Sequence, residues 1–595
     1  MENEVKEKKG FFSNPLFRSR VKSANVKLPE TVLGYLIGPF GAMLAGGIFA
    51  SFLNKYWTEV LFAGQLTKSV NTFLTLLPLL SAVLIIIGNI VAGQIIEKTR
   101  SKAGKARPWI LLSSITVALT SILMFISPSD NAIVKMVLMA ISYNLYYAVA
   151  SPLYNTANST MIPVSTRNGK QRSLLASANN MAALAVMGAG SMVFPVLLGL
   201  LVKESTPVKT AQNYWLIMFL IVGIVTFICA VLQYYFTRER VTEENFSVSK
   251  KVEKLPIKKQ LKAVTTDKFW WLIILFYFLF QVSGAIKNLS MTYFTANPSL
   301  SAFWGEGLDA NTAAGMTQTL LAVLGAIPMA VAVLIVWPLS NKIGKQKLTI
   351  IGMIIGVVGG FLAGIWHDNI VMVAIGVALK CLGSAPAGYL ILAMISDSLD
   401  HIEAKHGFRC DGFTMSIYSS IMVASTPIAM GIFNGISQSG KNSTGVIVSY
   451  IWIETAAYAL GAVVLLFFIV EKFLKEDQKK ILEHQKALAE ANGEVWIEPA
   501  ERLRLEEEEA DRQAEEARKA ELKAKCEKKG LDFEAEEAKY QAKLAAKKAK
   551  LEQKQAKKNK PSEVDAATDS DVTAESVAAN DKEISTEDDA SADGK

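Results

Sequence analysis

The chain has 595 residues, of which 51% are hydrophobic and 19% charged, and its formal net charge is +8. So much apolar sequence exceeds what one soluble core requires, which excludes a purely water-soluble globular protein and indicates a membrane protein. Two of the four cysteines fall in apolar runs and two in segments expected in the cytoplasm, which argues against a disulfide framework, and the four histidines are too scattered to suggest a metal site. The lack of a phosphate-binding loop argues against an ATP-driven pump.

Apolar runs of about 20 residues, long enough to cross roughly 30 Å of hydrocarbon, recur along most of the chain. We interpret them as helices, because backbone polar groups in lipid must be satisfied within the segment and the runs lack the alternation of barrel strands. The predicted fold is an all-α integral membrane bundle of twelve spans. The expected spans are residues 33–54, 73–96, 109–128, 132–155, 174–202, 214–236, 269–292, 315–339, 348–366, 369–395, 412–436 and 446–471.

Lysine and arginine gather in alternate loops, which the positive-inside rule assigns to the cytoplasm. An even number of spans then places both termini in the cytoplasm. The expected units are a basic N-terminus (1–30), a six-helix bundle (31–236), a cytoplasmic linker (237–268), a second six-helix bundle (269–473), a charged helical tail (474–560) and an acidic disordered tail (561–595).

The two bundles repeat each other weakly. Basic turns that contain glycine follow the second and eighth spans, at Gly104 and Gly344, and similar turns follow the fourth and tenth spans, "STRNGKQRS" (165–173) and "EAKHGFRC" (403–410). Both copies start from the cytoplasm, so the repeat is parallel. Such a repeat is typical of a secondary transporter whose halves rock about a central site.

Two motifs carry a resemblance to a known family. "GQIIEKTRSKAGKARPWIL" (93–111) and "SDSLDHIEAKHGFRCDGFTMS" (396–416) resemble loops of the major facilitator superfamily, in the version of the glycoside-pentoside-hexuronide:cation symporters, which include the melibiose carrier. The resemblance covers residues 30–473. It implies a major facilitator fold and carriage of sugars, and no enzyme activity.

In that family the first of these loops and its partners latch the cytoplasmic face. Opposed charges at helix ends can pair when this gate closes and hydrate when it opens. The alternative is that they are ordinary charges that set topology, each worth little as an exposed pair. The predicted latch consists of Glu97, Lys98, Arg100 and Arg107 with Asp397, Asp400 and Arg409.

The family's intramembrane carboxylates, which hold a cation and sugar hydroxyls, are missing. The resemblance aligns them with Met43, Ile85, Asn89 and Ala150, and it aligns a basic pair with Asn179 and Val423. Hard cations prefer carboxylate oxygens, so a coupling ion, Na⁺ or H⁺, is not supported by the usual residues, and no other cofactor is expected.

Polar and aromatic residues in the spans are the candidate sugar contacts, because amides and hydroxyls bond sugar hydroxyls and aromatic faces cover the ring. They also serve as hydrogen-bonding links between helices. Lys380 is a stronger candidate for a functional residue, because a cation inside the membrane is energetically costly. It could balance an anionic sugar, replace the charge of the missing cation or pair with Glu454. Lys287 is expected at the outer interface. The candidates are Asn89, Asn144, Tyr147, Tyr154, Asn155, Asn179, Lys380 and Tyr389.

After residue 473 the composition changes to Ala, Glu, Lys and Arg. Opposite charges four residues apart predict a solvated helix, interrupted near Trp496 by Gly493 and Pro499. The last 35 residues or so are acidic and lack aromatics, so we expect disorder there.

The sequence therefore predicts a secondary transporter of sugars or glycosides in the plasma membrane of a bacterial cell, working by alternating access as a cation symporter. Three alternatives stay open: an uncoupled carrier, a carrier of anionic sugars such as hexuronides, or a transport-dead receptor or scaffold that acts through its tail. The expected partners are a carbohydrate and the lipid bilayer, not nucleic acid; a cytoplasmic partner for the tail stays open.

Overall fold

The computed structural model of the protein describes residues 19–23, 25–99, 101, 104–166, 169–240, 257–305, 307–408, 411–491, 496, 499–542 and 545–546. Every regular element in these ranges is a helix. Eleven are long and apolar enough to cross a membrane, and the shorter apolar helix Arg107–Leu123 lies where the third span is expected. The twelve predicted spans are thus confirmed, although the tenth extends to His406 instead of residue 395.

The first half contains six spans, three of them interrupted by π-helical segments. Its elements are η3 (Glu30–Ile37), α1 (Gly38–Lys55) and η4 (Tyr56–Leu61), then α2 (Lys68–Lys98), α3 (Arg107–Leu123), α4 (Ala132–Asn144) with η5 (Leu145–Ala150) and α5 (Ser151–Ser165), α6 (Gly169–Gly188) with η6 (Ala189–Val193) and α7 (Phe194–Leu201), and α8 (Val208–Tyr235).

The second half repeats this number of spans. They are α11 (Lys268–Phe294), α13 (Ala310–Ile343), α14 (Lys345–Ile365), α15 (Ile370–His406), α16 (Asp411–Ser437), and α17 (Ser443–Ile447) with η8 (Val448–Trp452) and α18 (Ile453–Leu466). Short helices connect them: α10 (Ile257–Thr265), α12 (Pro298–Ser301), η7 (Ala302–Trp304) and η9 (Val470–Lys472). Residues 241–256 of the predicted linker lie outside the described ranges.

Polar caps fix where several spans begin. The Thr67 side chain accepts a hydrogen bond from the backbone N–H of Val70, and Asp267 accepts two from the first turn of α11. Asn369 caps α15 in the same way. Each cap satisfies donors that a helix leaves without an internal partner, so the chain can turn back into the apolar layer there.

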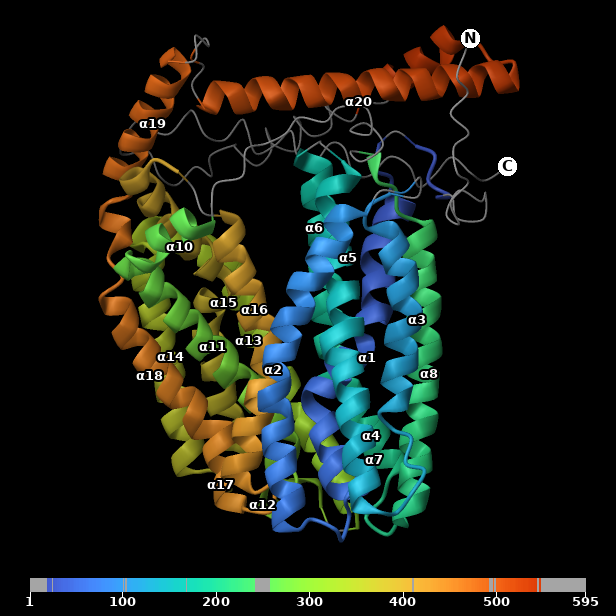
Figure 1. Ribbon diagram of the computed structural model, residues 1–595, viewed down its shortest axis with the longest axis vertical. Helices are drawn as coiled ribbons and strands as arrows, with labels where there is room; N and C mark the ends of the chain where they lie inside the picture. The colour runs from blue at the N-terminus through green and yellow to red at the C-terminus, as the bar shows by residue number, and fades with distance from the viewer. Residues whose placement is uncertain are drawn as a thin grey trace, which may run out of the picture.

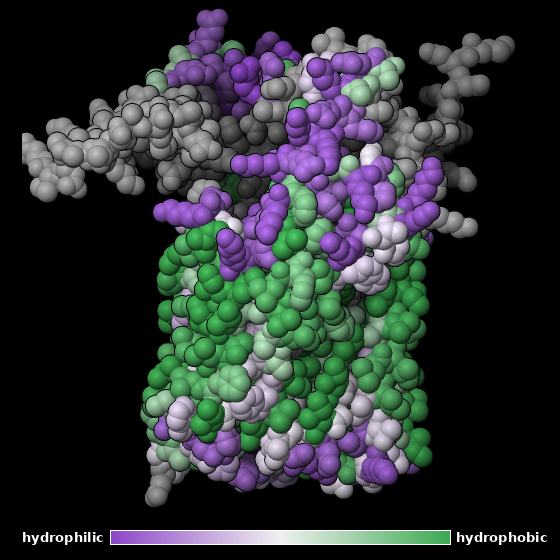
Figure 2. Space-filling view, turned by 90° about the vertical axis from the view of Figure 1, so that its left-hand side faces the viewer, coloured by the Kyte–Doolittle hydropathy of each residue, from purple (hydrophilic) through white to green (hydrophobic). Residues whose placement is uncertain are grey.

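The outer surface of the bundle is apolar. Leucine, isoleucine and valine side chains on α2, α8 and α14 are exposed, and Figure 2 shows a broad hydrophobic belt between hydrophilic caps. A belt of this kind is what a multi-pass membrane protein presents to lipid.

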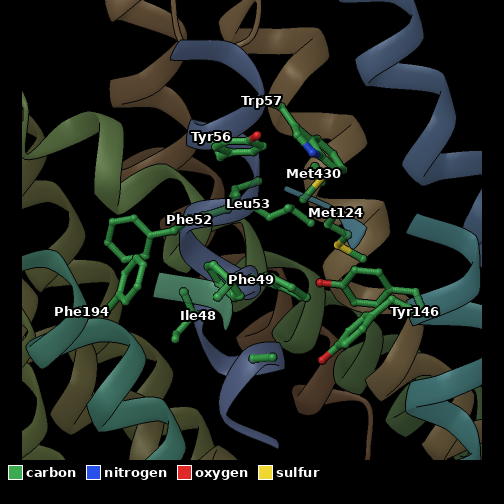
Figure 3. Packing of buried hydrophobic residues seen from close by; sticks show 14 of the residues in the cluster. Ile48, Phe49, Phe52, Leu53, Tyr56, Trp57, Met124, Tyr146, Phe194 and Met430 are labelled. Atoms are coloured by element: carbon green, nitrogen blue, oxygen red, sulfur yellow. The ribbon is translucent and has the colours of Figure 1, made fainter. Parts of the chain in front are cut away.

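The two halves meet at one end of the molecule and diverge toward the other (Figure 1). The helix pairs in contact are α2 with α16, α7 with α13, and α1 with α11. We call this meeting place the sealed end, and the opposite end, which carries the tail helices, the tail end. One hydrophobic cluster joins the two halves at the sealed end, where Met430 of α16 packs with Leu53 and Trp57 of the first half (Figure 3).

The tail forms two helices, α19 (Leu474–Ala491) and α20 (Pro499–Lys529), so the predicted break near Trp496 is confirmed. α19 is attached to the second half, where His401 lies 2.8 Å from Asp477. α20 extends across the tail end over the first half (Figure 1), and its Ala514 carbonyl accepts a 3.0 Å hydrogen bond from Asn25. The acidic segment 561–595 lies outside the described ranges.

Residues 533–542 form a further helical segment beside α20. Arg518 of α20 bonds Glu537 at 2.6 Å and stacks on the Tyr540 ring at 4.0 Å. The hydrogen bond from Arg518 lowers the pKa of Glu537. The tail is therefore a folded accessory held by ion pairs in water, unlike the apolar bundle.

Two carboxylates cap the repeated turns in the same way. Glu239, after α8, accepts hydrogen bonds of 2.7–2.8 Å from three consecutive backbone N–H groups, at residues 105, 106 and 107. Glu471, after α18, accepts one of 2.6 Å from the N–H of Lys345. Gly104 and Gly344 precede these donors with φ of +112° and +92°, and a Cβ at either would fall within 3 Å of the capping carboxylate. The glycines of the internal repeat thus let a carboxylate approach a helix start.

We expect Glu239→Gln to destabilise the protein by about 1–3 kcal/mol, because an amide presents an N–H₂ group to one of the three backbone donors. The measurement is the midpoint of thermal unfolding in detergent. Glu204→Gln is the control, since Glu204 is exposed. Equal midpoints for the two variants would contradict a capping role for Glu239.

Candidate functional site

A cavity of about 200 Å³ lies inside the first half. Two of the predicted sugar contacts, Tyr154 and Asn155 of α5, line it together with Ser151. Gly46 and Gly47 of α1 also line it, and a Cβ at Gly47 would collide with the Val186 side chain, so the glycine allows close packing there. The complete lining is Ala42, Met43, Gly46, Gly47, Val117, Tyr146, Ser151, Tyr154, Asn155, Ala183 and Val186, none of which is charged.

A chain of hydrogen bonds fixes one wall of this cavity. The Tyr154 hydroxyl donates to Gln233 Oε1 at 2.6 Å, and Gln233 Nε2 donates to Asn158 Oδ1 at 2.7 Å. Asn158 Nδ2 then donates to Asn179 Oδ1 at 2.9 Å. The predicted contact Asn179 is therefore part of a link between α5, α6 and α8. Through its hydrogen bond to Gln233, this link fixes the orientation of the Tyr154 side chain.

Beside the cavity lies a group of buried polar atoms that have no hydrogen-bond partner among the described residues. They are Trp57 Nε1, Tyr143 Oη, Tyr147 Oη and Asn144 Oδ1. The rings are in contact: Tyr143 and Tyr147 have centroids 4.6 Å apart, and Trp57 and Tyr143 5.5 Å apart. Tyr147 in turn lies 5.0 Å from Tyr146 of the cavity wall. We call Trp57, Tyr143, Asn144 and Tyr147 the unpaired aromatic cluster, after its three aromatic members.

Sequence reasoning found only half of this cluster. It singled out Asn144 and Tyr147 but missed Trp57 and Tyr143, because nothing in a single sequence distinguishes a paired from an unpaired aromatic hydroxyl. A buried polar group without a partner is costly, so native proteins rarely keep several together without a use.

Three of the predicted contacts lie outside the lining of the cavity. Asn89 on α2 donates to Ile85 of its own helix at 2.9 Å, and Asn144 likewise uses its amide nitrogen on Ala140. Tyr389 on α15 is 48% exposed. None of the three lines the cavity.

Lys380 pairs with Glu454, which was one of the three alternatives for it. Its ammonium lies 2.6 Å from Glu454 Oε2 and 3.2 Å from the carbonyl oxygen of Ile451. The expectation for Lys287 was wrong: its ammonium lies 3.3 Å from the other oxygen, Glu454 Oε1. The two lysines on α11 and α15 thus share one carboxylate on α18. The pattern of single spans could not reveal this, because the three residues meet only when the helices pack.

Two of the predicted latch residues, Arg107 and Asp397, make contacts within their own halves. The Arg107 guanidinium donates to the Tyr234 carbonyl at 2.9 Å and lies 4.6 Å from that residue's ring. Asp397 pairs with Lys345 at 2.6 Å. Glu97 and Lys98 end α2, and Asp400 lies near the end of α15; Arg100 and Arg409 lie outside the described ranges. A latch between the halves stays a prediction.

A polar seal closes the other end. Asn434 of α16 donates to Asn54 Oδ1 and to the Leu74 carbonyl, both at 2.9 Å, and Asn54 donates to the Tyr293 hydroxyl at 2.8 Å. Thr58 lies 2.9 Å from the same hydroxyl. Asn54 and Asn434 are fully buried. These bonds cross between the halves, so they hold the sealed end shut.

No group of three or more His, Cys, Asp or Glu side chains suited to a metal ion occurs within the described ranges. The positions that the resemblance aligns with family carboxylates hold apolar side chains or amides here. Of these, Met43 lines the cavity and Ile85 is fully buried.

Comparison with known proteins decides the family. The family model described as MFS/sugar transport protein matches residues 34–470. The chain belongs to that family. The isoprimeverose transporter of Lactiplantibacillus pentosus is 24% identical to this transporter over 461 residues, covering 74% of this chain and 88% of the relative. The glucuronide carrier protein homolog of Escherichia coli K12 is 23% identical, covering 66% and 79%.

Further comparisons agree. A lactose permease of Leuconostoc lactis is 20% identical over 79% of this chain and 74% of its own length. The crystal structure of a D-xylose-proton symporter has the same fold, with a TM-score of 0.50 and 14% identity over 74% of this chain and 97% of that chain. The resemblance to glycoside-pentoside-hexuronide symporters is confirmed. The chain is a multi-pass sugar transporter of the alternating-access type, and its relatives are transporters rather than enzymes.

We expect Asn434→Ala to open the sealed end, because both acceptors of its amide would lose their donor inside the protein. A cost of about 1–3 kcal/mol would raise the population of the separated conformation relative to the sealed one by about 5-fold to 150-fold. Electron paramagnetic resonance between spin labels at Lys68 and Ser443, one on each half, measures the separation. Asn213→Ala, at an exposed position on α8, is the control. Unchanged distances in Asn434→Ala would remove this amide from the seal.

Proposed function

We propose that this transporter carries a neutral glycoside, of disaccharide size or smaller, into a bacterial cell across the plasma membrane. The observation that carries the proposal is the unpaired aromatic cluster beside an uncharged cavity. Its indole N–H and phenolic hydroxyls would find in a sugar the partners that the protein does not supply, and the rings would cover the apolar face of the sugar.

A neutral substrate fits better than a hexuronide. The cavity lining carries no charge, and Lys380, the sequence's candidate for an anionic sugar, is held by Glu454. The relatives include an isoprimeverose transporter, a lactose permease and a glucuronide carrier homolog. The family therefore admits both kinds, and the charge of the site favours the neutral one.

The basic loops and both tail helices lie at the same end, which the positive-inside rule assigns to the cytoplasm. The sealed end would then face outside, and the observed conformation would be closed to the outside. In the opposite conformation the seal would break and the charged helix ends, from Glu97 to Arg107 and from Asp397 to Arg409, would latch the cytoplasmic side. One face of α20 contacts Asn25 of the first half. A cytoplasmic protein that bound the tail would therefore contact the other, solvent-exposed face of α20.

Within this proposal Trp57, Tyr143, Tyr147, Tyr154 and Asn155 contact the sugar. Asn89, Asn144 and Asn179 stay candidates that would exchange an existing hydrogen bond for one to a sugar hydroxyl. Tyr389 stays a candidate for the second half.

Uptake by the full chain in proteoliposomes tests the proposal. Labelled isoprimeverose, lactose and a methyl glucuronide are the probes. We expect saturable uptake of a neutral probe, competed by unlabelled sugar, and little uptake of the glucuronide. Uptake of the glucuronide alone would overturn the neutral assignment, and no uptake of any sugar would contradict a carbohydrate site in this cavity.

We expect Tyr147→Phe to separate stability from transport. Removing a buried hydroxyl that has no partner relieves a cost of about 1–3 kcal/mol, so the unfolding midpoint should not fall. Losing its bond to the sugar should raise KM by about tenfold. Tyr56→Phe is the matched control, because its hydroxyl donates to the Phe125 carbonyl at 3.3 Å; it should lower the midpoint and leave KM unchanged. A Tyr147→Phe variant with native KM would exclude that hydroxyl from the site.

A further inference from the structure

The second half buries three charged side chains together. Lys287, Lys380 and Glu454 come from α11, α15 and α18, and each ammonium contacts a different oxygen of the one carboxylate. The exposed fractions of the Lys380 and Glu454 side chains are 3% each, and that of Lys287 is 14%. With both lysines protonated and Glu454 ionised, the three residues carry a net charge of +1 within the membrane-spanning layer.

The surroundings do not offset this charge. Tyr458 donates a 2.8 Å hydrogen bond to Glu454 Oε1, and the Ile451 carbonyl of the π-helical segment accepts from Lys380. Lys287 also lies 3.8 Å from the Cys381 sulfur. The titratable groups that face the two ammonium groups are Glu454 and Tyr458 of α18, Tyr450 of η8 and Cys381 of α15. Among the described residues that face them, Glu454 is the one carboxylate.

An uncompensated charge out of water is strongly unfavourable, and the usual response of an ionisable group is to change its protonation. Loss of one proton from a lysine would leave a neutral cluster of one ammonium, one carboxylate and one amine. Lysine suits this role because its ammonium releases a proton when desolvated, which a guanidinium does not.

The geometry selects Lys287 as the group that releases the proton. Lys380 has the shorter contact to the carboxylate and a carbonyl partner besides, whereas Lys287 has the longer contact and the more exposed side chain. α11 also carries the seal: Thr292 donates to the Ser51 carbonyl at 3.2 Å, and Tyr293 contacts Asn54. Both lie within two turns of Lys287, so a change of charge there acts on a helix that joins the halves.

We propose that Lys287, Glu454 and Lys380 form a proton-binding site, and that one proton moves through Lys287 with each sugar. The inference rests on the proposed sugar transport and adds its coupling ion. On the cytoplasmic side the Nζ–H bond breaks, the proton passes to water and the electron pair stays on the amine nitrogen. On the outer side the amine takes a proton from water. The site replaces the carboxylates that the first half lacks.

An anion bound between the lysines would neutralise the cluster equally well. The observations favour the proton, because none of the three side chains lines the cavity of about 200 Å³ in the first half or either of two smaller cavities of about 40 and 10 Å³. A chloride or a substrate carboxylate would need such a space.

Proteoliposomes containing the full chain and a transported neutral sugar test the proposal with two readouts. Exchange of labelled for unlabelled sugar, without any gradient, reports transport alone. Accumulation driven by an inward pH gradient reports coupling; one pH unit sets about tenfold accumulation for one proton per sugar. We expect the wild type to give both, and addition of sugar to raise the external pH.

Lys287→Arg is the deciding variant, because it keeps the positive charge but cannot release a proton. We expect it to continue exchange while pH-driven accumulation falls to near onefold, and we expect the same of Lys287→Met. Lys135→Met is the matched control, since Lys135 is also a buried lysine in a span but bonds the Leu61 carbonyl and Gln65 at 2.8 and 3.2 Å; its accumulation should match the wild type.

Native accumulation by Lys287→Arg would overturn the proposal, because a charge partner alone would then suffice. Exchange by the wild type without pH-driven accumulation would also overturn it and would leave sugar transport standing. Accumulation that requires chloride and ignores the pH gradient would assign the cluster to an anion. Absence of exchange in the wild type would instead contradict the proposed function itself.

Discussion

Hydrocarbon offers no hydrogen-bond partner, and this constraint organises the whole protein. Every polar group between the two hydrophilic caps must be satisfied by another part of the chain. The regular elements of the described chain are therefore helices, the spans begin at side-chain caps such as Thr67 and Asp267, and buried amides are used in pairs. In the π-helical segment η8 the carbonyl of Ile451 accepts hydrogen bonds from the side chains of Lys380 and Thr455.

Polar groups are distributed unevenly between the two ends. At the sealed end they link the halves, through Asn434, Asn54 and Tyr293. At the tail end the contacts within each half include the Glu239 cap at the start of α3 and the Lys345–Asp397 pair, and the tail, which α19 attaches to the second half, bonds Asn25 of the first half. Rigid halves with an exchangeable interface are what alternating access requires, because each half must keep its own hydrogen bonds while the bonds between halves break and form.

Two groups of side chains that do not meet this constraint are informative for the same reason. The unpaired aromatic cluster carries a desolvation cost that a ligand could remove, and the cluster of two lysines and one carboxylate carries a positive charge that release of a proton could remove. The two sites lie in different halves. Sugar and ion would thus act on opposite sides of the interface that transport opens and closes, which distinguishes this chain from the family pattern of carboxylates in the first half.

The sequence by itself determined the membrane-spanning class, the twelve helices, the parallel repeat and the break in the tail, because these follow from local hydrophobicity, loop charge and residues such as Gly104 and Pro499 that act within a few positions. It also marked Tyr154, Asn155 and Lys380. Only the tertiary structure decided which polar groups are satisfied. Lys287 looked like an interfacial lysine until packing brought it to Glu454, and Trp57 and Tyr143 looked like ordinary core until their polar atoms were found without partners. Pairing depends on contacts between helices far apart in the chain, and no local pattern encodes those contacts.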